Sequence, residues 1–311
     1  MTSVDDATAD LVTQRLYDRG VPVVRLDPGD FLTCGSELRM SARLDDTGLA
    51  GVIITPSREL NLRHVRAAWW RRPSPYRAPP HWPTQDATFA VGEARFGFSG
   101  VLTALHDCLW INHPWRNHAA EYKPGQLVTA AECGFALAPT LITNDPFEAR
   151  AFAETYSPIV YKPLRQSIQK DQDGVNGMIW VRPVDPAELD DAVAGTAHMF
   201  QAEVEKVADV RVTVVGHRLF AVRIDSGLID WRADYETLTY TLIPCPPAVE
   251  SSIRQYMSSY GLVFAAFDFA LTPSGGWIFL ECNPNGQWAW IAEQEQAVAD
   301  ALTDLLERGR L

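Results

Sequence analysis

The sequence predicts an α/β (α+β) protein, and three observations lead to that fold class. Helix patterns and strand patterns alternate along the first two thirds of the chain, and the last third consists mostly of strand patterns. The length of 311 residues corresponds to about two average domains or more, and a hydrophobic share of 47% is enough for a sizeable core. From these patterns we expect three domains, at residues 1–118, 119–199 and 200–311.

The first region begins with a helix that Asp5 or Asp6 can cap and that Gly20 ends. Apolar and β-branched runs then predict three strands, and a helical pattern closes the region. These elements are the strands Val21–Leu26, Gly51–Thr55 and Val65–Trp70 and a long helix from about Asp86 to Leu109. The basic stretch Trp69-Trp-Arg-Arg72 is either a structural strand or a patch that binds an acidic peptide.

The second region contains two Asp-Pro pairs, Asp145-Pro146 and Asp185-Pro186. Each pair predicts the start of a helix, because Asp caps the free amide groups and Pro fits the first turn. A polar loop with glycines, Gln166–Gly177, separates two strand patterns. The other expected elements are a helix at about Pro124–Cys133 and the strands Thr140–Ile142, Ile159–Lys162 and Met178–Arg182.

The third region is predicted to be mostly antiparallel sheet, because short strand patterns follow one another closely. A helix interrupts the strands and another ends the chain. The expected strands are Phe200–Val204, Val210–Val215, Leu219–Ile224, Leu238–Leu242, Val263–Leu271 and Trp277–Cys282, and the helices are about Pro247–Tyr260 and Gln294–Leu306.

The composition excludes several classes of protein. A net charge of −12 argues against non-specific binding to nucleic acid or to an anionic membrane surface. The five cysteines are dispersed and form no CxxC pair, which is typical of a reduced intracellular protein. The start of the chain lacks the pattern of a signal peptide, and no apolar run is long enough to span a membrane. We therefore expect a cytoplasmic protein.

The last two strands give the sharpest deduction about chemistry. The Pro-Ser-Gly-Gly turn between them predicts a symmetric hairpin, which places Leu271 opposite Ile278 and Asp268 opposite Glu281. Side chains alternate between the two faces of a strand, so Asn283 shares the face of Glu281. Three oxygen-bearing side chains are thus expected together on one face of the sheet.

The opposed carboxylates Asp268 and Glu281 are a candidate metal site. Two carboxylates in apolar surroundings repel each other unless a cation lies between them. Oxygen ligands without His or Cys favour Mg²⁺ over Zn²⁺, and a Mg²⁺ held by few protein oxygens usually binds nucleotide phosphates as well. The alternative is that one carboxylate is protonated or lies exposed at the edge of the sheet.

Lysine is rare in this chain, which makes its positions informative. Of the 27 Lys and Arg residues only four are lysines, at positions 123, 162, 170 and 206. Lysine is a compact point charge that can reach a phosphate, whereas arginine is a planar fork. Lys162 ends a predicted strand, Lys123 lies at the start of a helix, and Gly174 and Gly177 permit close approach of a backbone to a phosphate. The alternative is chance, with arginine-favouring codons and a few remaining lysines.

The phosphate-binding motifs of two common folds are absent: the sequence contains neither GxxxxGK[ST] nor a GxGxxG that follows a strand. The order of features resembles instead the ATP-grasp superfamily, and within it the peptide maturases of the microviridin type (graspetide synthetases). The resemblance spans nearly the whole chain. It is carried by Trp69-Trp-Arg-Arg-Pro73, Trp110-Ile-Asn-His-Pro114, Lys123 with Gln126-Leu127, Pro139-Thr-Leu-Ile-Thr-Asn144, Tyr161-Lys-Pro-Leu164, Asp209-x-Arg211-Val-Thr-Val-Val-Gly216, Asp230-Trp-Arg232 and Glu281-Cys-Asn-Pro-Asn-Gly-Gln-Trp288.

The resemblance implies an ATP-grasp fold with an N-terminal α/β domain, a central domain and a C-terminal domain, and ATP between the last two. It implies that Lys123, Lys162 and the loop with Gly174 and Gly177 contact phosphates. A linker of Gln201, Glu203 and Val204 would meet adenine and Asp209 would belong to the nucleotide site, while Asp268, Glu281 and Asn283 would bind Mg²⁺, two ions in all. It also implies a homodimer.

Three arginines, Arg211, Arg223 and Arg232, are candidates for catalysis. An acyl phosphate and its tetrahedral successor concentrate negative charge, which fixed guanidinium groups can stabilise without reorganising. Strand alternation places Arg211 and Asp209 on one face. The alternative is that these residues form ion pairs on the surface of a sheet.

The chain departs from the resembled family at two places. The family begins with a strand ahead of the Asp-Asp helix cap, and here only Thr2-Ser-Val4 precede Asp5. The strand is then very short, or the sequence starts downstream of the natural start. The linker Gln201-Ala-Glu-Val204 has its acidic residue one position later than usual.

The resulting hypothesis is an ATP- and Mg²⁺-dependent ligase that activates Asp or Glu side chains of a precursor peptide as acyl phosphates and joins them to Ser or Thr as esters, or to Lys as amides. The precursor would carry a leader segment and a core with these residues. The main alternative is an ATP-grasp ligase that adds an amino acid to a protein or to a small carboxylic acid. A third reading is a nucleotide-binding protein with an inactive site.

Overall fold

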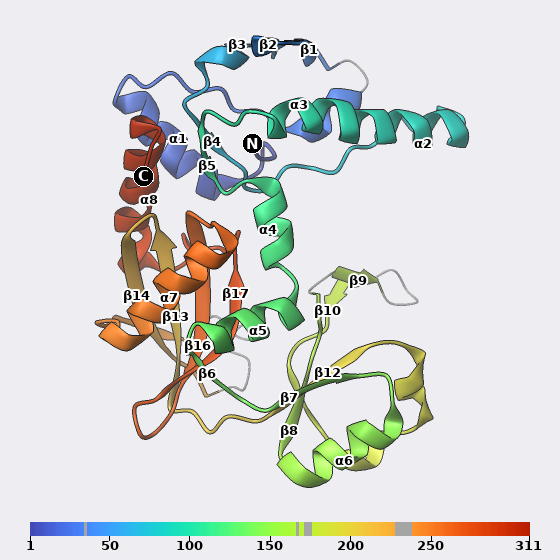
Figure 1. Ribbon diagram of the computed structural model, residues 1–311, viewed down its shortest axis with the longest axis vertical. Helices are drawn as coiled ribbons and strands as arrows, with labels where there is room; N and C mark the ends of the chain where they lie inside the picture. Colours follow the sequence, from blue (N-terminus) through green and yellow to red (C-terminus); the bar gives the residue numbers. More distant parts are fainter. Residues whose placement is uncertain (34–35, 166–167, 171–175, 228–237) are drawn as a thin grey trace.

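The computed structural model describes residues 1–311 except 34–35, 166–167, 171–175 and 228–237. Figure 1 shows an N-terminal region at one end, a six-stranded sheet next to it, and a four-stranded sheet at the other end. Helices and sheets are mixed throughout, so the expected fold class is confirmed. Within the described ranges, no helix is both long and apolar enough to cross a membrane.

The N-terminal region combines helices with small sheets. The side chain of Asp6 caps α1 by accepting a hydrogen bond from the amide of Ala9 at 3.3 Å. The strands β1 to β3 form one antiparallel sheet, and β4 pairs in parallel with β5. The elements are α1 (Ala7–Asp18), β1 (Arg39–Asp45), β2 (Gly48–Ile54), β3 (Glu59–Asn61), β4 (Ala67–Trp69), α2 (Thr84–Glu93), α3 (Ser99–Thr103), β5 (Leu109–Ile111) and α4 (Pro114–Ala120).

Two expectations for this region are wrong. The segment Val21–Leu26 is not a strand, because a strand needs a continuous partner and this segment gains no ladder of backbone hydrogen bonds. The long helix does not reach Leu109. It runs through a π-helical stretch at 94–98 and ends at Thr103, and Leu109 instead begins a strand next to β4. At the start of the chain, Thr2 makes a single parallel bridge with Arg72.

The four-stranded sheet has the order β11-β8-β12-β7 and carries α6. Its members are β7 (Thr140–Thr143), α6 (Pro146–Tyr156), β8 (Ile159–Lys162), β11 (Arg182–Val184) and β12 (His198–Ala202). The predicted strand Met178–Arg182 is wrong: β10 (Asn176–Met178) ends where it should begin, and it pairs with β9 (Ile168–Lys170). The second Asp-Pro pair starts only a short 3₁₀ helix at 186–188.

The six-stranded sheet has the order β15-β14-β13-β16-β17-β6. Helices α5 and α7 pack on one of its faces, and α8 packs on the other together with α1 from the start of the chain. Its elements are α5 (Lys123–Glu132), β6 (Ala136–Leu137), β13 (Ala208–Val215), β14 (Arg218–Asp225), β15 (Thr239–Leu242), α7 (Pro247–Tyr260), β16 (Phe264–Leu271), β17 (Trp277–Asn283) and α8 (Ala292–Arg308).

Alternation along the central strands separates a core face from a functional face. Val210 and Val212 of β13 and Phe267 and Phe269 of β16 point into the core beneath α5 and α7. The residues between them, including Arg211 and Asp268, must therefore point to the opposite face. Helix α8 covers only part of that face. The remaining part is turned toward the four-stranded sheet.

Candidate functional site

A cavity of about 410 Å³ lies between the four-stranded and the six-stranded sheets. One wall comes from β8, β12 and the segment after β12, and the other comes from β13, β16 and β17. Elements that are distant in the sequence meet here because the two sheets face each other across it. Of the residues singled out in the sequence, the cavity is lined by Lys162, Gln201, Glu203, Val204, Asp209, Asp268 and Glu281.

A β-bulge brings Asp268 and Glu281 into register. Next to the turn, Leu271 pairs with Trp277, so the pairing with Ile278 that a symmetric hairpin predicts is wrong. The register then shifts by one residue directly before Asp268, and Asp268 pairs with Glu281 as expected. A bulge adds one residue to one strand of a pair and re-aims the side chains beside it. The hairpin thus reaches the expected pairing by a route that the symmetric register does not contain.

The protein itself supplies counter-charges for both carboxylates. Arg211 Nη1 donates hydrogen bonds to both carboxylate oxygens of Asp268, at 2.7 and 2.9 Å, and Asn283 Nδ2 donates to Asp268 Oδ2 at 3.1 Å. Lys123 Nζ lies 3.2 Å from Glu281 Oε2. Asp268 and Glu281 are 6% and 8% exposed, so these contacts form away from bulk water. The cations offset the repulsion between the carboxylates, and their opposition alone therefore does not require a metal.

The donor set fits Mg²⁺ better than a transition metal. In the part of the chain that the structure describes, no group of three His, Cys, Asp or Glu residues is arranged to hold a metal ion. An ion at Asp268 and Glu281 would therefore have two carboxylates and the amide oxygen of Asn283 as protein ligands. Mg²⁺ is commonly bound by one or two carboxylates, with water and phosphate oxygens completing its shell. An asparagine amide can present either its N–H groups or its oxygen. Asn283 can therefore donate to Asp268, as it does here, or turn its oxygen toward a bound ion.

The neighbouring cysteine takes no part in this chemistry. Cys282 lies between the two polar residues of β17, but its side chain is 1% exposed and packs in the core beneath α7. Burial raises the pKa of the Cys282 thiol well above its usual range. The thiol is therefore protonated at neutral pH and is no nucleophile.

Gln126 ties helix α5 to strand β17. Its amide nitrogen donates to the carbonyl oxygens of Cys282 at 2.8 Å and Ala120 at 2.7 Å, and its amide oxygen accepts from Cys282 N at 3.0 Å. The side chain is 3% exposed. Because Lys123 lies one turn earlier on the same helix, this anchor sets the position of the Lys123 ammonium group relative to Glu281.

Replacing Gln126 by Leu is expected to lower the free energy of unfolding by about 2–4 kcal/mol, because the change leaves three buried backbone groups without their partner. Urea denaturation followed by circular dichroism measures the change. The matched control is Gln14→Leu, on the exposed face of α1, where a change within about 0.5 kcal/mol is expected. Equal stability of the Gln126 variant and the wild type would contradict the anchoring role.

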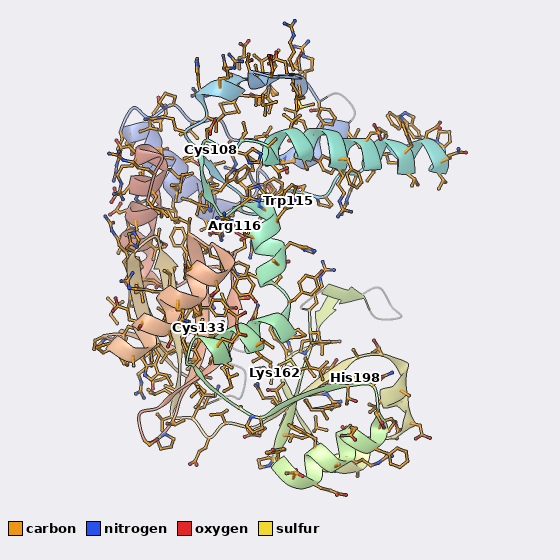
Figure 2. All side chains as sticks on the ribbon, in the orientation of Figure 1. Cys108, Trp115, Arg116, Cys133, Lys162 and His198 are labelled. Atoms are coloured by element: carbon orange, nitrogen blue, oxygen red, sulfur yellow. The ribbon has the colours of Figure 1, made fainter. Side chains whose placement is uncertain are left out.

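Lys162 lies on the opposite wall of the cavity, at the end of β8, in the part of the four-stranded sheet that approaches α5 (Figure 2). It is 6% exposed, and its Nζ donates to Gln201 Oε1 at 2.9 Å. Gln201 Nε2 in turn donates to Thr140 Oγ1 at 2.8 Å. These hydrogen bonds fix the position of the buried Lys162 ammonium group on this wall of the cavity.

The segment after β12 and the start of β13 carry a further pair of charges. Lys206 Nζ donates to both carboxylate oxygens of Asp209, at 2.8 and 2.6 Å, and both residues line the cavity. Glu203 and Val204 lie on the same segment, as the linker hypothesis requires, but Gln201 belongs to β12 and directs its side chain at Lys162.

Some of the expected site residues do not meet here. Arg223 pairs across the sheet with Val210, so it lies on the core side rather than beside Arg211, and its guanidinium contacts Asp225 at 2.6 Å. Gly177 lies in β10 and is exposed. Gly174 and Arg232 lie outside the described residues.

Two residues that support the site had no role assigned from the sequence, although both lie in stretches that carry the family resemblance. Arg71 is 2% exposed, although it belongs to the basic stretch that could equally have formed a surface patch. Gln287 lies in the turn after β17 and contacts both Arg71 and Arg211. The signal in the sequence was the two motifs at 69–73 and 281–288, and neither motif reveals which distant residue it contacts.

The chain was compared with protein-family models and with solved structures, and both comparisons find ATP-grasp proteins. Residues 1–118 match the family model of the MvdD pre-ATP grasp domain. The chain also superposes on an ATP-grasp ligase associated with ribosomally produced peptides (RiPPs) from Chryseobacterium gregarium, solved with ADP and with a leader and core peptide. The TM-score is 0.89 at 24% identity, covering 98% of this chain and 94% of that one.

Two further solved structures share the fold. The macrocyclase MdnB from Microcystis aeruginosa MRC has a TM-score of 0.80 at 25% identity, with 98% of this chain and 97% of that chain covered. The ATP-grasp ligase PsnB, solved with a minimal precursor, Mg and ADP, has a TM-score of 0.74 at 21% identity, with 98% and 96% covered. No curated protein sequence matches the chain. The expected ATP-grasp fold is confirmed.

Proposed function

We propose that this chain, an ATP-grasp ligase of the microviridin type with an MvdD pre-ATP-grasp domain at residues 1–118, cross-links side chains of a precursor peptide at the expense of ATP. It would activate Asp or Glu side chains as acyl phosphates and join them to Ser or Thr as esters, or to Lys as amides. The observation that carries the proposal is the cavity between the two sheets, with Lys162 on one wall and Asp268 and Glu281 on the other.

The nucleotide would lie in this cavity. Glu203 and Val204 line it where the adenine is expected, and the buried ammonium group of Lys162 faces the interior that phosphates would occupy. Lys123 does not line the cavity, but its Nζ contacts Glu281, which does, and we assign to Lys123 the second phosphate contact. In the ligase from C. gregarium ADP is present, which agrees with this assignment.

Asp268, Glu281 and Asn283 would hold Mg²⁺, which when bound screens the phosphate charges and orients the terminal phosphate. We assign two ions, on the resemblance of the chain to ATP-grasp ligases. PsnB was solved with Mg and ADP. The protein's own contribution is to fix the two carboxylates in register and to keep water away from them by burial.

Arg211 is the residue best placed to stabilise the reacting carboxylate. It is 5% exposed and is held by Asp268 on one side and by the carbonyl oxygen of Gln287 on the other. A guanidinium group fixed in this way stabilises negative charge without reorganising during the reaction. Arg223 lies on the other face of the sheet, and we give it no role in this step.

The substrate would be a precursor peptide with a leader segment and a core that contains Asp or Glu together with Ser, Thr or Lys. We further propose that the enzyme acts in the cytoplasm as a homodimer. The peptide assignment is supported by the leader and core peptide bound to the ligase from C. gregarium.

The test is intact-mass spectrometry of candidate precursor peptides incubated with the enzyme, ATP and Mg²⁺. Each cross-link removes one water, so the peptide should lose one water mass per link, and the loss should require ATP. The alternative ligase, which adds an amino acid to a carboxylic acid, would increase the mass of its substrate instead. A peptide mass that stays unchanged with every candidate precursor from the same gene neighbourhood would count against the proposal.

A further inference from the structure

The turn that follows β17 lies directly against Arg211. The carbonyl oxygen of Gln287 accepts a hydrogen bond from Arg211 Nη2 at 3.0 Å. A Cβ atom at Gly286 would lie 2.8 Å from Arg211 Nη2 and 2.6 Å from the Cβ of Ala266, so only glycine fits there without a shift. The turn is therefore closely packed against Arg211, and a displacement of the turn would also displace the guanidinium group that holds Asp268.

Arg71, from the N-terminal region, holds the other side of the same turn. Its Nη2 donates to Gln287 Oε1 at 2.5 Å, and its carbonyl oxygen accepts from Asn285 Nδ2 at 2.6 Å. One residue thus contacts the turn through both its side chain and its backbone. Gln287 links the two arginines: its side-chain oxygen faces Arg71 and its backbone oxygen faces Arg211.

Arg71 is itself held in a fixed position. Its Nε lies 2.9 Å from Asp6 Oδ2, its guanidinium group stacks over the ring of Trp69 at 5.5 Å, and Thr2 Oγ1 donates to the same Asp6 oxygen at 2.6 Å. Burial lowers the pKa of Arg71 to about 10, with Asp6 opposing the shift, so the arginine remains charged at neutral pH. A buried ion pair is costly to assemble, and its value often lies in specifying one geometry rather than in stability.

We propose that Arg71 and Gln287 are positioning residues through which the N-terminal region sets the geometry of Arg211 and Asp268. This inference rests on the proposed function, and it gives the N-terminal region an indirect part in the reaction, through the position of Arg211. The path is a set of contiguous contacts: Asp6 fixes Arg71, Arg71 fixes the turn at 284–288, and the turn fixes Arg211. The exposed neighbour Arg72 takes no part in it.

The test compares Gln287→Leu with Gln287→Glu. Leucine removes the acceptor for Arg71, whereas glutamate keeps one, so the second variant should restore what the first loses. For Gln287→Leu we expect kcat for condensation to fall about 10–100-fold, because a displacement of about 1 Å at a reacting group costs rates of this order. The KM for ATP should change by less than about twofold, since the nucleotide walls are untouched. Arg71→Lys should behave like Gln287→Leu, and the control Arg43→Gln, at an exposed position of β1, should behave like the wild type.

A kcat of Gln287→Leu within twofold of the wild type would overturn the proposal, as would equal losses in the leucine and glutamate variants. If the wild-type enzyme condenses no precursor, the proposed function fails, and the contact path is then judged by hydrogen–deuterium exchange. Faster exchange of the amides at 286–288 and 211 in Gln287→Leu, but not in Gln287→Glu, supports the path. Unchanged exchange in both variants overturns it.

Discussion

Replacing Asp268 by Asn is expected to lower the rate of ATP-dependent condensation about 10²- to 10³-fold, the usual cost of removing one preorganised electrostatic contact from an active site. Asp268 would ligate Mg²⁺ and also receives two hydrogen bonds from Arg211. The neutral amide is a poor ligand for a hard cation and leaves Arg211 without this carboxylate. The measurement is the rate of water loss from the precursor at saturating ATP and varied Mg²⁺.

The same substitution should also reduce stability. Breaking one side of a buried ion pair costs about 3–5 kcal/mol, and the 6% and 5% exposure of Asp268 and Arg211 places this pair in that class. Rates must therefore be measured well below the unfolding temperature of the variant. The matched control is Asp225→Asn, which removes the carboxylate of a surface pair with Arg223 and should leave the rate within about twofold. Wild-type turnover by Asp268→Asn would remove Asp268 from the metal site.

Replacing Lys162 by Met should lower kcat/KM for ATP about 10²-fold, the order expected for losing a charged hydrogen bond to a phosphate in a buried site. Methionine has a similar length and can remain beside Gln201 without the charge. The effect should appear in nucleotide affinity as well as in turnover. Isothermal titration calorimetry with ADP and Mg²⁺ measures the first, and single-turnover mass spectrometry measures the second.

The control for Lys162 is Arg182→Met, on the neighbouring strand of the same sheet. Arg182 pairs with Tyr161 across the ladder, but its side chain is 60% exposed and contacts Glu188. Its removal should leave the affinity for ADP unchanged within twofold. Undiminished ADP binding by Lys162→Met would place the phosphates elsewhere in the molecule.

The elements that the sequence predicted well are those whose signals are local. The helix Pro247–Tyr260 matches its expected bounds, because Pro stands at its first turn and Gly261, with a φ of 63°, stands just after its end. The strand around Phe267 carries apolar residues on both faces, and the strand around Val210 carries valines at alternate positions. Val21–Leu26 has an equally good local pattern but is not a strand, since forming a ladder depends on a partner that the pattern does not contain.

The residues of the candidate site likewise divide into those with a local signal in the sequence and those without one. Asp268 and Glu281 were expected opposite each other from a symmetric hairpin. The register next to the turn differs from that hairpin, and a β-bulge directly before Asp268 restores the expected pairing. Lys162 could be singled out because lysine is rare in this chain. Arg223 was named together with Arg211 as a candidate for catalysis, yet its pairing with Val210 puts it on the other face of the sheet. Which residues of two strands share a face depends on the register of their pairing, and the loop between the strands does not reveal that register.

By itself, the sequence determined the class of fold and the order of most elements, and it singled out Asp268 and Glu281 as a pair, all from residues close together in the chain. Only the tertiary structure decided that Arg211 and Lys123 neutralise those carboxylates, that Lys162 faces them across a cavity, and that Arg71 lies buried against the turn behind Arg211. The physical reason is that each of these contacts joins residues at least 40 positions apart. Their distance is set by how sheets and helices pack, and no short-range pattern encodes that packing.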